Sequence, residues 1–272
     1  MKRWMPGTVF LLTWFSVAAW QIPAGPVAAW LDLPVAASGW SGTIWRGAAD
    51  DVSVVTPAGR VALGRVNWSV QPASLWRGNL CLSMDSALHE QQVSGTVCRA
   101  KGGGLQVEGL SAESPVAAWA DALALGLRGD LVLLVESLHI EQGRIAALKS
   151  RASWSRAAFH DGTQWTELPV IVMRGQPAHE GGLALQFHDQ GESLTPLTLD
   201  IESGIDRQGR YHTRGRITTT TQTPESLMRW LPVIARAEGG GEFHIDWTGA
   251  LEWTAHRRPA REAADAVQYV AR

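Results

Sequence analysis

Short runs in which apolar and polar residues alternate recur along most of the chain, and they constrain its fold more than any other feature. In residues 183–187 and 197–201 every second residue is apolar, and the residues between are small or polar. Such alternation is typical of a β-strand with one face on a core and the other in water. The 28 glycines suit tight turns between strands. The sequence therefore predicts a mainly β fold, either a long curved antiparallel sheet or an open two-lobed β-sandwich.

Two other strand signals carry more detail. Val61 and Leu63 alternate in one parity, whereas Val66 and Trp68 alternate in the other, so a β-bulge is expected at Gly64-Arg65. Residues 131–135 are apolar without interruption, which predicts a strand buried on both faces. Further strands are expected at residues 105–110, 145–154 and 243–247.

Two short helices are expected to accompany the sheet. Ser114-Pro115 is typical of a helix start, and apolar residues then recur at helical spacing up to residue 127, shortly before Gly129. Thr223-Pro224 precedes a second such segment, which Pro232 kinks or ends. The shared order of strand, capped helix, glycine and strand indicates either two related lobes, divided within residues 155–167, or a chance similarity.

The N-terminal segment has the composition of a membrane anchor. Residues 4–31 contain no charge, and residues 4–22 are mostly apolar, about long enough to span a bilayer as a helix. Lys2 and Arg3 precede this run and favour a cytoplasmic N-terminus, while Trp4 and Trp20 suit the two membrane interfaces. The alternative is a signal peptide cleaved near Ala19. Both interpretations export the rest of the chain, and the expected compartment is a Gram-negative periplasm.

The predicted organisation follows from these signals. We expect an anchor at residues 1–22, a juxtamembrane linker at 23–37 and a periplasmic β domain at 38–252. Residues 253–272 are basic and broken by proline, and are expected to form a flexible tail.

The two cysteines, Cys81 and Cys98, lie on runs that read as a hairpin. If the chain turns near residues 86–92, Cys81 faces Cys98 and Leu82 faces Val97. Directly opposed residues are close enough for a disulfide. An oxidising compartment favours the bond, whereas the cytoplasm would keep both thiols free.

No catalytic, metal or cofactor motif is present in the sequence. His89-Glu90 and His179-Glu180 lack the second histidine of a zinc-protease motif, and the segment 39–42 lacks the spacing of a nucleophile elbow. The formal net charge is -2, with basic residues scattered along the chain, which disfavours nucleic acid as a partner. The sequence therefore predicts a protein that is not an enzyme and uses no cofactor.

Tryptophan is unusually abundant, with 14 residues. Trp40, Trp45 and Trp76 adjoin glycines at the ends of predicted elements, so they are candidates for an exposed contact with a partner. By contrast, Trp68, Trp119, Trp230 and Trp247 lie on apolar stripes and are expected to pack in the core.

The order of several short motifs resembles the protein N family of the type II secretion system. These motifs are IPA (residues 22–24), GTIWRG (42–47), NWSVQPASLWRG (67–78), GDL (129–131) and WSRA (154–157). The resemblance implies a single-pass inner-membrane protein, mostly periplasmic, that serves a machine exporting folded proteins across the outer membrane. It implies other secretion components as partners, including inner-membrane proteins and the secretin, and no catalytic residues.

An alternative function remains open from the pattern of strands. Periplasmic proteins of the AsmA-like group also have long glycine-punctuated β structure, and they carry lipid in an apolar groove. Strict alternation allows either a filled core or such a groove. A lipid is therefore the second candidate partner.

Overall fold

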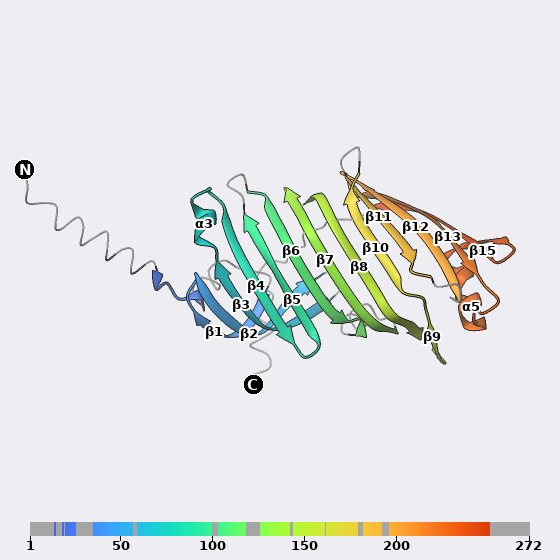
Figure 1. Ribbon diagram of the computed structural model, residues 1–272, viewed down its shortest axis with the longest axis horizontal. Helices are drawn as coiled ribbons and strands as arrows, with labels where there is room; N and C mark the ends of the chain where they lie inside the picture. Colours follow the sequence, from blue (N-terminus) through green and yellow to red (C-terminus); the bar gives the residue numbers. More distant parts are fainter. Residues whose placement is uncertain are drawn as a thin grey trace, which may run out of the picture.

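One sheet accounts for most of the structure. The computed structural model describes residues 14, 18, 20–25, 35–56, 59–99, 103–117, 126–141, 144–160, 162–178, 182–191 and 196–250. Within these residues the chain forms a single fifteen-stranded sheet in which all paired strands are antiparallel (Figure 1). The strands are β1 (Val35–Gly42), β2 (Arg46–Thr56), β3 (Gly59–Val70), β4 (Leu80–Leu88), β5 (Gln91–Arg99), β6 (Leu105–Pro115), β7 (Leu127–Glu141), β8 (Arg144–His160), β9 (Trp165–Glu167), β10 (Ile171–Pro177), β11 (Gly182–Asp189), β12 (Leu197–Asp206), β13 (Arg210–Thr219), β14 (Arg236–Gly239) and β15 (Glu242–Ala250).

The strands lie side by side almost in the order of the chain. The order is interrupted at two places: β9 pairs only with β8, and β15 lies between β13 and β14. Strand direction turns progressively along the sheet, as expected from the inherent twist of β-strands (Figure 1). The predicted mainly β fold is confirmed, and of the two expected architectures the structure has the long antiparallel sheet.

The expected bulge lies in the pairing of β2 with β3. Val52 faces Gly64, but the next residue, Ser53, faces Ala62, so Leu63 is an extra residue on β3. Gly64 has a φ of +67°, a conformation that glycine adopts without the steric cost of a Cβ atom. The change of parity in the sequence therefore located this bulge correctly.

Following the paired residues across the sheet shows that one of its faces is apolar. Directly opposed residues project to the same face, and this face stays apolar across the register shifts in β6 and β7. We call it the apolar face; it carries Leu82, Val97, Val107, Leu138, Leu148, Ala152, Met173, Phe187, Ile201, Ile217 and Ile245.

The opposite face carries most of the charge, and we call it the polar face. Two rows of opposed residues cross its second half: Arg151, Arg174, Gln186, Glu202, Arg214 and Asp246 in one, and Ser153, Val172, His188, Asp200, Arg216 and His244 in the other. His188 and His244 both lie on this face.

Helix α5 (Glu225–Ile234) covers the apolar face at the C-terminal end of the sheet (Figure 1). Leu227 and Leu231 of the helix pack with Ile217, Phe243 and Ile245 of the sheet, and all five are buried. The hydroxyls of Thr166 and Ser226 form a hydrogen bond of 2.7 Å, which joins β9 to α5. Both residues are almost fully buried, at 3% and 1% exposure.

The second predicted helix exists, but its details differ. The N-cap is Pro224 rather than Thr223, whose hydroxyl instead donates to the carbonyl oxygen of Pro196. The buried side of the helix contains Ser226 together with Leu227 and Leu231. With these residues on its buried side, the helix leaves Trp230 45% exposed, so the prediction that Trp230 packs in the core is wrong. Trp247, at 46%, is also more exposed than predicted.

The first predicted helix does not have the expected ends. Ser114 and Pro115 end strand β6, and Leu127 and Gly129 belong to β7. Gly129 is therefore not a helix stop; it has a φ of +122° beside a register shift between β7 and β8. Residues 118–125, which include Trp119, lie outside the described residues. The other short helix described is α3 (Pro72–Leu75).

One strand prediction also needs correction. Residues 131–135 do form part of β7, but the strand is not buried on both faces, because Leu134 is 46% exposed on the polar face. Residues 155–160, which lie within the segment expected to divide two lobes, continue β8. The pairing path runs through this region without a break, and the division of the chain into domains stays a prediction.

No helix in the described part of the chain is both long and apolar enough to cross a membrane. Most of the expected anchor, including Trp4, lies outside the described residues, as does the expected tail at residues 253–272. The anchor and the tail therefore stay predictions.

The hydrogen bond between Thr166 and Ser226 predicts non-additive losses of stability. We expect T166V in the full chain to lower the free energy of unfolding by about 1–3 kcal/mol, because the Ser226 hydroxyl stays buried without a partner. S226A should cost a similar amount, and the double variant less than the sum of the two. Urea unfolding followed by tryptophan fluorescence measures all three. Strictly additive losses would contradict a direct coupling of these hydroxyls.

Candidate interaction surface at the N-terminal end of the sheet

The sheet begins at a tight turn that joins β1 to β2 and contains the GTIWRG segment. The N–H of Thr43 donates to the carbonyl oxygen of Arg46 at 2.9 Å and closes the turn. Gly42 has a φ of +82°, and a Cβ atom there would lie 2.5 Å from the Arg46 carbonyl oxygen. A Cβ atom at Gly47 would lie 2.5 Å from the Trp68 ring. Both glycines are therefore required for the close approach of the chain to itself.

The side chain of Trp68, on β3, supports the β1–β2 turn. Its indole N–H donates to the carbonyl oxygen of Thr43 at 3.2 Å. The ring centroid lies 5.8 Å from that of Trp40, with the planes tilted by 59°. Aromatic pairs favour such tilted packing. Trp40 is thus partly engaged within the sheet, although 37% of it remains exposed.

Trp45 lies at the outer side of the same turn and holds the N-terminal segment. Its ring stacks on Trp20, with centroids 5.8 Å apart and planes 14° apart. The N–H of Ile44 donates to the carbonyl oxygen of Ile22 at 3.0 Å, and Pro23 forms a β-bridge with Thr43. Residues 20–23 are therefore packed against the turn.

Trp76 lies on the adjoining connection between β3 and β4, which we call the Trp76 loop (residues 71–80). Trp76 directly follows α3 and is 93% exposed, and Leu75 and Leu80 are 41% and 49% exposed. The Ser74 hydroxyl donates to the Gln71 carbonyl at 2.7 Å and accepts the Cys81 N–H at 3.2 Å. An ordered backbone thus presents an indole to solvent.

The Cys81–Cys98 pair lies at the base of this loop. The register places Cys81 opposite Cys98 and Leu82 opposite Val97, as expected from the sequence. The two cysteines form a disulfide across the β4–β5 pair, with Cα atoms 4.0 Å apart. The carbonyl oxygen of Cys81 accepts the N–H of Gln71 at 2.9 Å. The cross-link therefore supports the strand to which the Trp76 loop is attached.

The structure gives the three candidate tryptophans different environments. Trp40 of β1 and Trp45 of the β1–β2 turn contact other indoles, whereas Trp76 projects from a neighbouring loop. The sequence did not single out Trp68 or Leu80 as part of this end of the molecule. Trp68 reads as an ordinary strand residue, and only the pairing of β2 with β3 brings it under the turn.

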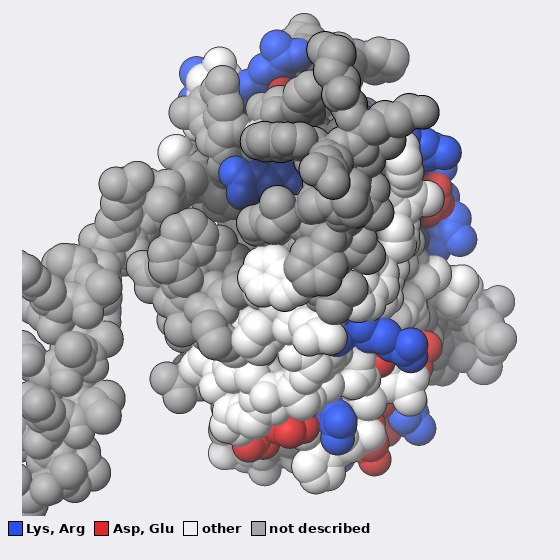
Figure 2. All heavy atoms as spheres, turned by 90° about the vertical axis from the view of Figure 1, so that its left-hand side faces the viewer, with Lys and Arg blue, Asp and Glu red and all other residues white. Residues whose placement is uncertain are grey.

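Charge is interspersed at this end of the sheet. Figure 2 shows Lys and Arg side chains in separate groups, with Asp and Glu beside several of them and uncharged surface between. No concentrated field of one sign is visible on this view. Across the described residues, no group of three or more His, Cys, Asp or Glu side chains is placed to hold a metal ion.

Comparison with known proteins identifies the family. The family model for the type II secretion system (T2SS) protein N matches residues 34–246, which is most of the chain and nearly the whole sheet. The chain belongs to the type II secretion system protein N family. The resemblance noted in the sequence is therefore confirmed. No curated protein and no solved structure matches the chain significantly.

Two of the motifs that carried the resemblance to this family contact each other in the structure. The GDL motif begins β7 and the WSRA motif lies in β8. The indole N–H of Trp154 donates to the Arg128 carbonyl at 3.0 Å, and Arg156 pairs with Asp130. A Cβ atom at Gly129 would lie 2.6 Å from the Trp154 indole nitrogen. The two motifs thus form one packed unit.

Membership of the protein N family indicates that the chain is a component of the secretion machinery and is located in the cell envelope. The family is a structural component of that machinery and is not a known enzyme. Its members are expected to work by contact with other components, so exposed surfaces such as the Trp76 loop are candidate binding surfaces.

The close packing around Gly47 in the β1–β2 turn predicts that a larger residue at this position lowers the stability of the protein. We expect G47A to lower the free energy of unfolding by about 1–3 kcal/mol, because its methyl group overlaps the Trp68 ring and the Ser41 carbonyl oxygen. G204A adds a methyl group to a strand position with open space around it, so it should cost far less. Thermal unfolding of the full chain compares the two. Equal losses would show that Gly47 is not required for this contact.

The Cys81–Cys98 disulfide should be present in the protein as it exists in the cell. In protein taken from cells in the presence of an alkylating agent, Cys81 and Cys98 should resist labelling until a reductant is added. C81S/C98S should lower the free energy of unfolding by about 2–4 kcal/mol, as for other disulfides that close short loops. Mass spectrometry of the alkylated peptides and urea unfolding measure the two effects. Full labelling without reductant would mean that the thiols are free in the cell.

Proposed function

We propose that the chain is a non-enzymatic component of the type II secretion system that helps to export folded proteins across the outer membrane. The observation that carries this proposal is the family match over residues 34–246. In this proposal residues 1–22 anchor the chain in the bacterial inner membrane, with Trp4 and Trp20 at the interfaces and the N-terminus in the cytoplasm. The β domain, predicted at residues 38–252, lies in the periplasm.

The packing of the N-terminal segment supports a stiff connection between such an anchor and the sheet. Trp20 stacks on Trp45, and Ile22 and Pro23 pair with the β1–β2 turn. Ala24 is buried, at 5% exposure. The predicted linker at residues 23–37 thus begins in contact with the sheet, through Pro23 and Ala24. An anchor attached here would set the orientation of the first strands.

The Trp76 loop is the best candidate for contact with another secretion component. Tryptophan is strongly enriched among residues that dominate binding energy at protein interfaces. Trp76 is almost fully exposed and is flanked by partly exposed Leu75 and Leu80, so apolar surface is available here for contact with a partner. Trp45 and Trp40 extend the candidate surface onto the neighbouring turn. Inner-membrane components and the secretin are the proposed partners.

A second function is favoured by the state of the apolar face. Away from α5, many of its side chains are only half-buried, among them Leu82, Val97, Leu138, Leu148 and Met173. An apolar strip of this length is what a carrier of lipid acyl chains requires. The alternative proposal is therefore a periplasmic lipid-binding or lipid-transfer protein of the AsmA-like kind.

Photo-crosslinking in intact cells tests both proposals. A photoreactive residue at position 76 samples the Trp76 loop, and one at Leu148 samples the apolar face. Gln208, in the exposed turn between β12 and β13, is the matched control at the other end of the sheet. Mass spectrometry identifies what each position captures.

We expect position 76, but not position 208, to capture a secretion component. W76A should reduce secretion of a folded substrate without lowering the melting temperature, because the indole makes little contact with the sheet. Capture of phospholipid at Leu148, with no protein captured at position 76, would refute the secretion proposal and establish the lipid alternative.

A further inference from the structure

A pair of arginines lies directly opposed in the middle of the polar face. Arg151 of β8 faces Arg174 of β10 in the register, and both are exposed. Opposed residues on neighbouring antiparallel strands lie about 4.5–5.5 Å apart at their Cα atoms, and like charges in this position are destabilising. The pair therefore costs stability unless another group compensates it.

No such group is found among the described residues. Neither guanidinium has a hydrogen bond or ion pair with another described side chain. The neighbours in the same row are Leu134 on one side and Gln186 on the other. Acidic residues on the surrounding strands are engaged or displaced: Glu136 pairs with Lys149, Gln186 donates to Glu202, and Glu113 of β6 faces Val132 rather than an arginine.

Two other arginines on the polar face have different neighbours from Arg151 and Arg174. Arg214 lies between Glu202 and Asp246, and Arg216 lies opposite Asp200. Opposite charges in such cross-strand positions stabilise a sheet. The register thus gives these two arginines acidic neighbours and gives Arg151 and Arg174 none.

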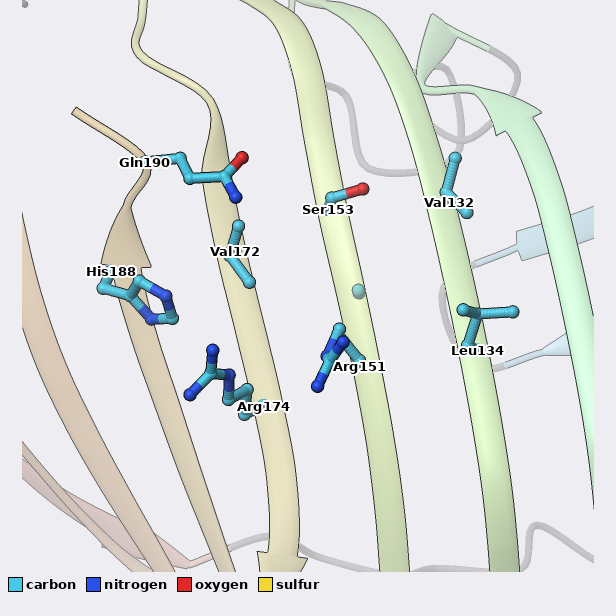
Figure 3. A pocket seen from close by; sticks show the side chains of 9 residues that line it. Val132, Leu134, Arg151, Ser153, Val172, Arg174, His188 and Gln190 are labelled. Atoms are coloured by element: carbon cyan, nitrogen blue, oxygen red, sulfur yellow. The ribbon is translucent and has the colours of Figure 1, made fainter. Parts of the chain in front are cut away.

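The arginine pair lines a hollow of about 260 Å³. Figure 3 shows Arg151, Arg174 and His188 close together on neighbouring strands, with Val132 and Leu134 on the strand beside Arg151. Val172 is buried at its base, at 6% exposure, whereas Leu134 remains 46% exposed. The hollow is thus basic on one side and apolar on the other.

These features select the kind of ligand. Two guanidinium groups present planar forks that suit a carboxylate. Phosphate sites commonly use free backbone N–H groups, but here β8 and β10 are paired on both sides, so their backbone donors are committed to the sheet. The hollow is smaller than the roughly 300–1,000 Å³ of a typical small-molecule site, and it is large enough for one or two side chains.

We infer that Arg151 and Arg174 bind an acidic residue of a protein partner, with a neighbouring apolar side chain of that partner resting on Val132 and Leu134. This inference deepens the proposed function, because it names the chemistry of a second contact within the secretion machinery. Arginine is enriched at protein interfaces, and a carboxylate placed between the two guanidiniums would remove their mutual repulsion.

The test compares the full chain with R151Q/R174Q. The matched control is R214Q/R216Q, which removes two exposed arginines from the same face. Thermal unfolding should show R151Q/R174Q to be as stable as the unaltered chain or more stable, because a like-charge pair is lost. The control variant should be equally or less stable, because Asp200, Glu202 and Asp246 lose the positive charge that lies opposite them in the register.

Binding is measured with labelled peptides by fluorescence anisotropy. The probe is a blocked peptide that contains two Glu residues among Leu and Phe, and its Gln counterpart is the control peptide. The Glu peptide should bind the unaltered chain and R214Q/R216Q about tenfold more tightly than R151Q/R174Q, as expected for loss of charge-assisted hydrogen bonds. The Gln peptide should bind all three proteins equally weakly. Binding of the Glu peptide should weaken as salt is added.

Two further probes separate other sources of negative charge. Arginine-dependent binding of inorganic phosphate, or of vesicles containing an anionic phospholipid, without binding of the Glu peptide would overturn the assignment to a protein partner. Equal binding of the Glu peptide to all three proteins would overturn the site itself. Crosslinking from position 76 in cells is a separate measurement. If position 76 captures a secretion component but the Glu peptide does not bind, this inference alone is refuted. If position 76 captures no secretion component, the proposed secretion role is refuted.

Discussion

The register of the strand pairs is the constraint on which this structure depends. A shift of one residue between two strands would exchange the two faces of every strand beyond it. The sheet nevertheless keeps Leu82 and Ile245, near its two ends, on the same face. It does so although the pairing shifts beside Gly95, within β6 and β7, and beside Gly129. The shifts therefore occur in compensating positions, and glycine provides several of them.

The sequence predicted those parts of the fold that depend on neighbouring residues. The strands, the bulge at Gly64 and the opposition of Cys81 and Cys98 follow from local alternation. Helix α5 was also predicted, although Trp230 was assigned to its buried side. That error arose because the helix turns its Ser226 inward, and the Thr166 hydroxyl that makes this possible lies 60 residues away in the sequence.

Features that depend on pairing between distant strands were not predictable in this way. The helix signal at Ser114-Pro115 was locally sound, but pairing of β6 with β7 extends the strand through both residues. Arg151 and Arg174 are each ordinary polar residues in an alternating strand. Only the pairing of β8 with β10 places them opposite each other and shows that they lack an acidic neighbour. Trp45 was a candidate from the sequence, whereas its stacking on Trp20 required the structure.

The strand order has a consequence for how such a chain can assemble. From β1 to β8, each strand pairs with the one made just before it, so most contacts are between segments close in sequence. A chain released from its N-terminus can therefore lengthen the sheet by one hairpin at a time, with the most recent strand as the template. The edge that grows remains open until β15 pairs with β13, after which β14, an exposed strand of only four residues, forms the edge. In an assembly of this kind the last strand, β15, would also complete the apolar surface on which α5 packs, through Phe243 and Ile245.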